Sequence, residues 1–172
     1  MSAISNIYLT HGAMLLCALA CLVVALPEGG GRIVAAWRVP VAALLAGVAA
    51  LLLVAYPTWG ELKNPELWMF SIVAGVAGVA RGFWMQLDVD HAWRLLRLTR
   101  AADCRVATFA LVGLALVEVW LAFSGPADQP TMELGMTVIA SFLIARAAAV
   151  MVRARQEPQS DLHDRPSPPV EE

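Results

Sequence analysis

Residues 67 to 86 read LWMFSIVAGVAGVARGFWMQ, a run of twenty residues with one basic and no acidic side chain. About 20 helical residues, each rising about 1.5 Å, cross a hydrocarbon layer about 30 Å thick. The run is apolar nearly all round, whereas a helix on the surface of a soluble domain keeps a polar face. This stretch therefore predicts a transmembrane helix.

Four more stretches share this character, and 59% of the 172-residue chain is hydrophobic. They are approximately Ile7 to Leu26, Val39 to Tyr56, Val106 to Ser124 and Glu133 to Val152. No stretch alternates polar and apolar residues over a sustained length, so helices are favoured over a β-barrel. The sequence predicts an all-α polytopic membrane protein, in which residues 1–155 form one domain of five transmembrane helices in an antiparallel bundle.

The basic residues predict how this bundle is oriented. Eleven of the twelve Lys and Arg residues lie on one side of the expected membrane, and Lys63 alone lies on the other. Because basic residues are retained on the cytoplasmic side, we expect the N-terminus outside and the C-terminus inside. The first apolar run has no basic residue before it, which favours an uncleaved helix over a signal peptide.

The end of the chain has a different composition from the apolar runs. Residues 156–172 contain four Pro, several acids and almost no apolar side chain. Such a segment gains too little from burial to offset the entropy cost of ordering it. We therefore expect a disordered cytoplasmic tail.

The inner connection from Leu87 to Arg105 is long enough to hold structure of its own. Asp90 and Arg94 are four residues apart, which favours a helical extension of the third span. On such a helix, Val89, Trp93 and Leu96 would form a narrow apolar stripe able to lie on the membrane.

Small residues recur at spacings of three and four along the third predicted helix. Gly78 and Gly82 form a small-xxx-small pair, a pattern that lets a second helix approach closely. The set predicts a packing seam, and a five-helix protein has internal partners for it before a homodimer does. Its members are Ser71, Ala74, Gly75, Gly78 and Gly82.

Two arginines lie inside predicted helices near their cytoplasmic ends. Arg81 and Arg146 sit at similar depth, and each is close enough to the boundary to extend its guanidinium among the headgroups. Alternatively, both face inward with Asp88 or Asp90. In that arrangement they would form a site for an anion or a lipid headgroup phosphate.

One acidic side chain, Glu118, lies within the fourth predicted helix. His11, in the first helix, enters from the same outer side and reaches a comparable depth. The two side chains are able to share a contact that each lacks in lipid. A structural link between helices, proton or ion handling, and ligand binding all remain open for this pair.

The first helix also carries Met14, Cys17 and Cys21 on one stripe, with His11 at its edge. Sulfur and imidazole ligands suit Cu(I) or haem. The spacing matches no metal signature, however, and such side chains in an apolar helix are mostly packing residues. We therefore expect no metal site and no cofactor.

Familiar catalytic patterns such as GxSxG, HExxH and the Walker motif are absent from the sequence. We expect a small bacterial inner-membrane protein that is not an enzyme and has a structural or accessory role. Its bundle face would bind lipid or a partner membrane protein, and no nucleic acid. The alternatives are a small transporter or channel using Glu118 and His11, and a redox or metal-handling membrane protein.

Overall fold

The computed structural model describes residues 2–30, 32–54, 65–98, 102–124, 130–160 and 162. Five α-helices make up most of this part of the chain, which confirms the predicted all-α class. A short 3-10 helix and three short strands accompany them. The elements in chain order are α1 (Ser2–Ala25), η1 (Leu26–Gly30), β1 (Ile33–Ala35), α2 (Arg38–Val54), α3 (Pro65–Trp84), β2 (Leu87–Asp90), β3 (Leu95–Leu98), α4 (Ala102–Ser124) and α5 (Pro130–Ala154).

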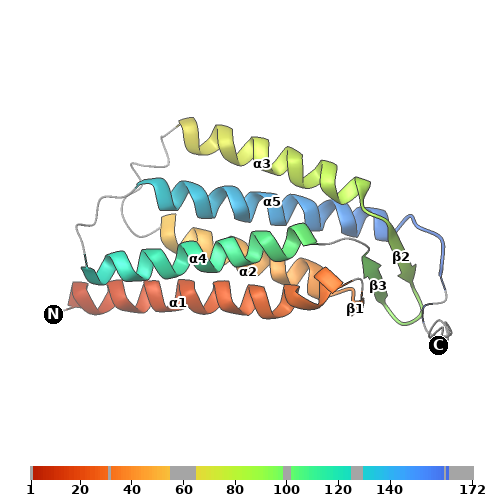
Figure 1. Cartoon of the computed structure of the whole chain (residues 1–172), viewed down its shortest axis with the longest axis horizontal. Helices are drawn as coiled ribbons and strands as arrows, with labels where there is room; N and C mark the ends of the chain where they lie inside the picture. Colours follow the sequence, from red (N-terminus) through yellow and green to blue (C-terminus); the bar gives the residue numbers. More distant parts are fainter. Residues whose placement is uncertain are drawn as a thin grey trace, which may run out of the picture.

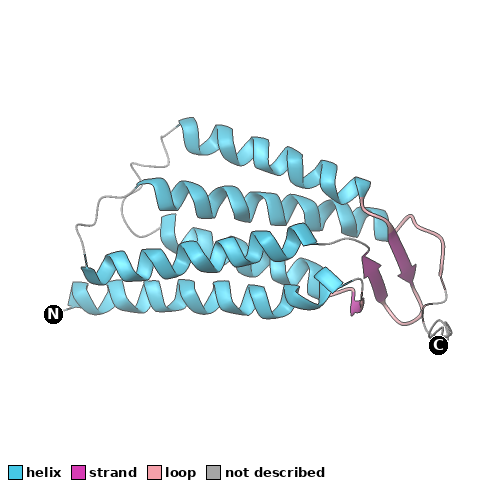
Figure 2. Ribbon diagram, in the orientation of Figure 1, coloured by secondary structure: helices cyan, strands magenta, loops and turns pink. Residues whose placement is uncertain are grey.

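The helices lie side by side in a bundle, with the strands gathered at one end (Figures 1 and 2). The predicted antiparallel arrangement holds for the packed pairs α1–α2, α1–α4, α2–α5 and α4–α5, whereas α3 and α5 run parallel. Helix α1 packs against α2 and α4, and α5 packs against α2, α3 and α4. Helix α3 lies at the edge of the bundle and packs mainly on α5. The chain starts at the end opposite the sheet, and this end of the bundle is called the outer end below.

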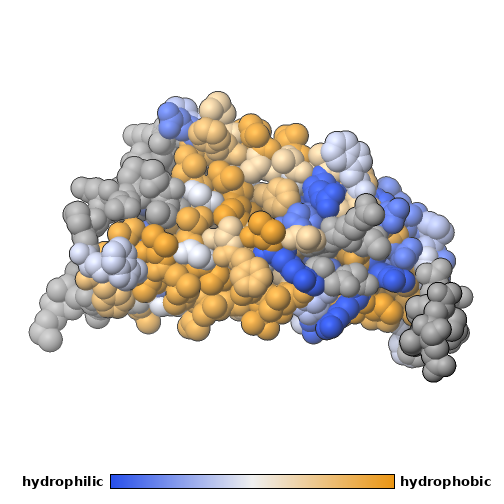
Figure 3. Space-filling model, in the orientation of Figure 1, coloured by the Kyte–Doolittle hydropathy of each residue, from blue (hydrophilic) through white to orange (hydrophobic). Residues whose placement is uncertain are grey.

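Four helices are long and apolar enough to cross a membrane. These candidate spans are Leu9–Glu28, Pro65–Trp84, Ala102–Ser124 and Glu133–Ala154. Helix α2 is equally apolar but has 17 described residues, about 25 Å at the usual rise of an α-helix. Apolar side chains cover the length of the helices in Figure 3, while hydrophilic ones gather near the sheet. The chain is thus a multi-pass membrane protein built as a helical bundle.

The packing between these helices depends on small side chains. Ala18, Ala46, Ala49 and Ala115 are all fully buried in the core shared by α1, α2, α4 and α5. In lipid there is little hydrophobic drive between helices, so association depends on how closely the backbones approach. Alanine at these positions permits that approach.

The glycine seam of α3 faces α5. A Cβ atom added to Gly82 would lie 2.6 Å from the Cβ of Ala149, and one added to Gly78 would overlap the backbone oxygen of Phe142. At Gly75 the nearest atom, the Cβ of Ala145, is at an ordinary 3.9 Å. The seam therefore lies inside the bundle and is tightest towards the sheet end.

The inner connection forms a hairpin, so the predicted helical extension is wrong. Strands β2 and β3 pair antiparallel, and β3 also pairs with β1, giving the order β1-β3-β2. The side chains that alternate along the hairpin pack on the end of α5 in one hydrophobic cluster. These buried residues are Leu87, Val89, Leu96, Leu98, Ala147, Val150 and Ala154.

The turn of this hairpin explains why a helix does not continue here. The Oδ1 atom of Asp90 accepts hydrogen bonds from the backbone N–H groups of Ala92 and Trp93, at 3.0 and 3.1 Å. Such an Asp side chain competes with helical hydrogen bonding and favours a turn. Arg94 completes the turn with a left-handed φ of 52°. The Asp90–Arg94 spacing therefore belongs to a turn.

The beginning of the predicted tail also differs from the expectation. The backbone N–H of Ser160 donates to the carbonyl of Val89 at 2.8 Å, and Gln159 forms a β-bridge with Val89. Leu162 is buried. This segment lies along the edge of β2 that does not pair with β3, where a strand offers unpaired backbone groups. Residues 163–172 of the predicted tail lie outside the described part of the chain.

The orientation in the membrane gives a first testable prediction. A reporter fused after Glu172 should report the cytoplasm, and one inserted at Asn64, between α2 and α3, should report the outside, because the arginines concentrate at the sheet end. Paired alkaline phosphatase and green fluorescent protein fusions measure both positions. A periplasmic signal from the C-terminal fusion would reject the orientation.

Candidate functional site

A buried ion pair joins η1, which follows α1, to α5 at the sheet end of the bundle. The Nη1 atom of Arg146 lies 3.2 Å from the Oε2 atom of Glu28. Their side chains are 2% and 1% exposed, respectively. The two residues are 118 positions apart in the sequence. Arg146 therefore points into the bundle and does not extend to the headgroups.

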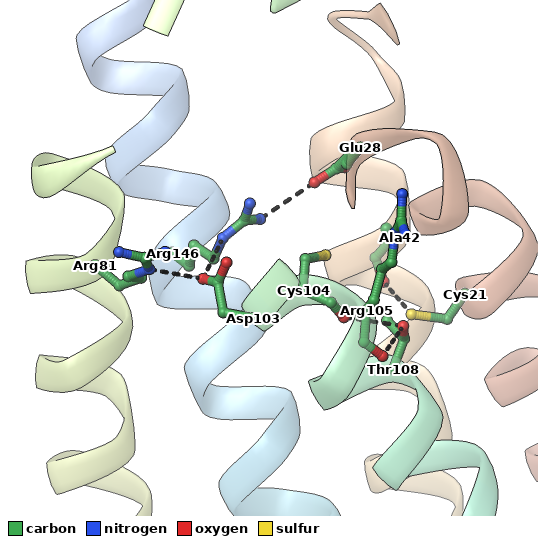
Figure 4. A network of polar contacts seen from close by, with 9 residues as sticks. All are labelled: Cys21, Glu28, Ala42, Arg81, Asp103, Cys104, Arg105, Thr108 and Arg146. Carbon is green, nitrogen blue, oxygen red and sulfur yellow. Dashed lines mark hydrogen bonds and ion pairs between the residues drawn. The ribbon is translucent and has the colours of Figure 1, made fainter. Parts of the chain in front are cut away.

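Asp103 extends this pair into a network of four charged side chains (Figure 4). Its Oδ2 atom lies 3.4 Å from Nε of Arg146 and accepts a hydrogen bond from Nε of Arg81 at 3.1 Å. Asp103 lies in the first turn of α4, where the helix dipole favours a negative charge. The network thus connects η1, α5, α4 and α3.

The acidic partners of Arg81 and Arg146 differ from those predicted from the sequence. The ion pairs of Arg81 and Arg146 are with Asp103 and Glu28. Asp90 accepts hydrogen bonds in the hairpin turn, and Asp88 lies opposite Arg97 in the β2–β3 register. The proposed set of Arg81, Arg146, Asp88 and Asp90 is therefore not brought together as one site.

Glu28 and Asp103 were missed as site residues, although each carries a weak signal. Glu28 is the acidic residue that directly follows the first apolar run, within the sequence LPEGG of η1. Asp103 lies three residues before the fourth run. An acid next to a membrane boundary is ordinary in either place, and only the folded arrangement puts both beside Arg146.

The network does not satisfy all of its polar atoms. Among the described residues, Oε1 of Glu28, Oδ1 of Asp103 and Nη2 of Arg146 are buried without a hydrogen-bond partner. An unsatisfied buried group costs roughly 1–3 kcal/mol, so such a network adds little net stability. We infer that the network favours this arrangement of the four elements, because separating them would leave buried charges unpaired.

Arg153 makes a second polar connection between α5 and α3. Its Nη1 group donates to the carbonyls of Gly82 and Phe83 at 3.1 and 2.8 Å, and to that of Met85. The last carbonyls of a helix lack partners within the helix, and a basic side chain satisfies them favourably. Arg153 also pairs with Glu157 at 2.8 Å, at the start of the segment that covers β2.

At the outer end, His11 and Glu118 connect α1 to α4. Nε2 of His11 lies 3.7 Å from Oε1 of Glu118. This separation suits an ion pair when the imidazole is protonated, and it exceeds the usual hydrogen-bond length of about 2.7–3.2 Å. The structure brings the predicted pair together, and both side chains are mostly buried.

This pair gives a prediction that separates a polar link between the helices from one that needs the carboxylate charge. Glu118→Gln retains size and polarity, so a structural link predicts stability close to wild type. Glu118→Ala removes the group facing His11, and we expect a loss of about 1 kcal/mol, or a few degrees in the melting temperature. Thermal unfolding of the purified protein in detergent measures both variants. Equal destabilisation by Gln and Ala would show that the carboxylate charge itself is needed.

The sulfur side chains of α1 are packing residues. Met14 and Cys21 are buried in the core, and Cys17 packs against it. The thiol of Cys21 donates to the carbonyl of Ala42 at 3.1 Å. Within the described ranges, no group of three or more His, Cys, Asp or Glu side chains is placed to hold a metal ion.

No protein-family model matches the chain, and no curated protein or solved structure matches it significantly. The functional interpretation accordingly depends on the residues and contacts themselves. They define a multi-pass helical membrane protein in which charged side chains join helices at both ends of the bundle.

Proposed function

We propose that the protein is a structural or accessory component of a bacterial inner membrane, without catalytic activity, and that its bundle face binds lipid or a partner membrane protein. The observation that carries the proposal is the position of α3. This helix packs mainly on α5, and its other face is exposed and apolar. The exposed large side chains of α3 are Trp68, Met69, Phe70, Ile72, Val73, Val76, Val79, Phe83 and Trp84.

An apolar face on a membrane helix lies against lipid or against another protein. Trp68 and Trp84 are exposed near the two ends of α3, and indole rings favour the interfacial regions of a bilayer. Lipid tails are as apolar as the residues between them, so a partner helix would bind through close packing. The face thus offers a contact surface within the membrane.

The ionisable side chains inside the bundle support an accessory role in a different way. Glu28, Asp103 and Arg146 contact one another, and His11 faces Glu118. These contacts connect helices that are far apart in the sequence. Charges paired in this way favour one arrangement of the helices.

Composition supports the assignment to a bacterial inner membrane. In the sequence, eleven of the twelve basic residues fall on one side of the predicted spans, and Arg strongly outnumbers Lys. The first feature matches the charge asymmetry of inner-membrane proteins. The second is typical of GC-rich bacterial genomes.

Site-specific photo-crosslinking in native membranes tests the proposed face. A photoreactive residue replaces Val76 on α3, and a matched probe replaces Leu16 on the exposed face of α1. We expect the Val76 probe to give a discrete adduct, with one protein or one class of phospholipid, that the Leu16 probe does not give. The same unspecific lipid labelling at both positions would contradict a dedicated face.

The His11–Glu118 contact favours one alternative, a small transporter or channel. In that case proteoliposomes containing the wild-type chain would conduct protons down a pH gradient, and Glu118→Gln would abolish the flux. An accessory protein predicts no flux above empty vesicles for either form. Flux that depends on Glu118 would replace the proposed function.

A further inference from the structure

The pairing of β1 with β3 brings two distant turns together at the sheet end. Ala35 lies opposite Leu95, and the backbone N–H of Ala36 donates to the carbonyl of Arg94 at 2.9 Å. Trp37 follows Ala36 in the turn between β1 and α2. The turn before α2 therefore lies beside the tip of the β2–β3 hairpin.

This pairing fixes the depth of the hairpin tip relative to the membrane. Helix α2 starts at Arg38 and is apolar after this residue, which places Trp37 and Arg38 at the boundary of the hydrocarbon layer. The hydrogen bond to the Arg94 carbonyl holds the tip at the same level. Trp93 and Arg94 thus lie at headgroup depth, although they belong to a connection between helices.

The side chains at this junction are aromatic and basic. Trp37 and Trp93 are 55% and 63% exposed, and Arg94 is also exposed. The guanidinium of Arg38 lies over the Trp37 ring, 5.6 Å from its centroid. We call Trp37, Arg38, Trp93 and Arg94 the Trp-Arg corner.

Among the described residues, the nearby acids are engaged elsewhere. Asp90 is buried and accepts hydrogen bonds from the hairpin turn, and Glu28 is buried against Arg146. Asp88 lies opposite Arg97 in the strand register. The corner therefore presents two positive charges beside two exposed indole rings.

We propose that the Trp-Arg corner binds the headgroups of anionic phospholipids in the leaflet at the sheet end. The indole rings lie among the headgroups and glycerol groups, and the guanidinium groups donate paired hydrogen bonds to lipid phosphates. Lipids with a net negative charge are preferred, because a zwitterionic headgroup carries a positive ammonium group beside the phosphate, and the arginines repel it. This inference rests on the proposed function and names the lipid class and the place where it binds.

Native mass spectrometry of the full chain, released from detergent with added lipid, tests the corner. The probes are phosphatidylglycerol and phosphatidylcholine at equal concentration. The variants are Arg38→Gln, Arg94→Asn and the double change, since Asn tolerates the left-handed φ of Arg94. Arg155→Gln is the matched control, because Arg155 is exposed at the same end outside the corner.

Removing one arginine that lies near an anionic surface lowers the affinity for lipid about fivefold. We expect that loss for phosphatidylglycerol in each single variant, a larger loss in the double variant, and less than a twofold change for Arg155→Gln. Phosphatidylcholine binding should change little. Equal losses for both lipids, or the same loss in the control, would overturn the proposal.

A competition arm separates the lipid from a soluble anion. Inorganic phosphate at the lipid concentration should leave phosphatidylglycerol bound, because it lacks the acyl chains that place a headgroup at this depth. Displacement by phosphate would assign the corner to a soluble anion and overturn the lipid proposal. Melting temperatures of the variants identify any loss of lipid binding that follows from unfolding. If Arg38→Gln unfolds the protein, the result for Arg94→Asn decides, because Arg94 lies at the exposed hairpin tip.

The outcomes for the corner and for the proposed function are separate. The crosslinking experiment probes α3 and the flux experiment probes His11 and Glu118, so neither depends on the corner. A discrete α3 adduct together with unchanged lipid binding in the corner variants would reject this inference alone.

Discussion

Arg146→Ala is expected to destabilise the protein by about 3–5 kcal/mol, the usual cost of leaving buried charges without their partner. Glu28 is 1% exposed and would lose its ion pair, while Asp103 would keep only its hydrogen bond from Arg81. For a chain of this size, the loss corresponds to a melting temperature lower by about 10 °C. Thermal unfolding in detergent, followed by circular dichroism, measures the change.

A double substitution distinguishes the charge from the packing of the long side chain. Glu28→Leu with Arg146→Leu removes both charges together, and Asp103 still pairs with Arg81 at 3.1 Å. Replacing a buried ion pair by apolar groups is often neutral, so the double variant should melt close to wild type. If Arg146→Ala and the double variant are equally unstable, the loss comes from packing and the network is not the cause.

The sequence predicted the helices well because the evidence for them is spread over many residues. Four of the five apolar runs form helices long and apolar enough to cross a membrane, the fifth forms the shorter helix α2, and all five helices lie close to the expected positions. The glycine seam was also readable, because a helix repeats its face every three or four residues. Gly78 and Gly82 do face one neighbour, α5.

The small sheet was missed because its signals are short. Leu87 and Val89 alternate for only four residues, and the Asp90–Arg94 spacing fits a helix as well as a turn. Strand β1 has three residues and pairs only once β3 is in place. These elements form because the end of α5 offers an apolar surface, which no local pattern in the sequence indicates.

The buried network shows the same limit for charged residues. The sequence predicted that Arg81 and Arg146 lie at the same depth in their helices. In the structure both contact Asp103, which agrees with this prediction. Their acidic partners depend on how η1 and α4 enter the bundle. Glu28 is 118 residues from Arg146, so the pair exists only in the three-dimensional arrangement.

Gly78→Leu should have the second large effect, the separation of α3 from the bundle. A Cβ atom at this position overlaps the backbone oxygen of Phe142 and lies 3.1 Å from the backbone nitrogen of Arg146. Backbone atoms of a helix cannot rotate away as a side chain can, so α3 and α5 must separate. Overpacking typically costs about 1–3 kcal/mol, and we expect the upper end or more, since α3 packs mainly on α5.

Gly113→Leu on α4 is the matched control for this change, because an added Cβ there meets no atom within 4 Å. Leucine favours a helix over glycine by up to about 1 kcal/mol, so the control should be as stable as wild type or slightly more stable. The readout is the melting temperature together with cleavage of the α2–α3 connection by an added protease. Separation of α3 would also pull Arg81 from Asp103. Adding Arg81→Met to Gly78→Leu should therefore cost little further stability. Adding Arg81→Met to Gly113→Leu should cost as much stability as it does in the wild-type protein. Independent effects of Gly78→Leu and Arg81→Met would show that α3 stays in place, and the seam would then not be what holds it.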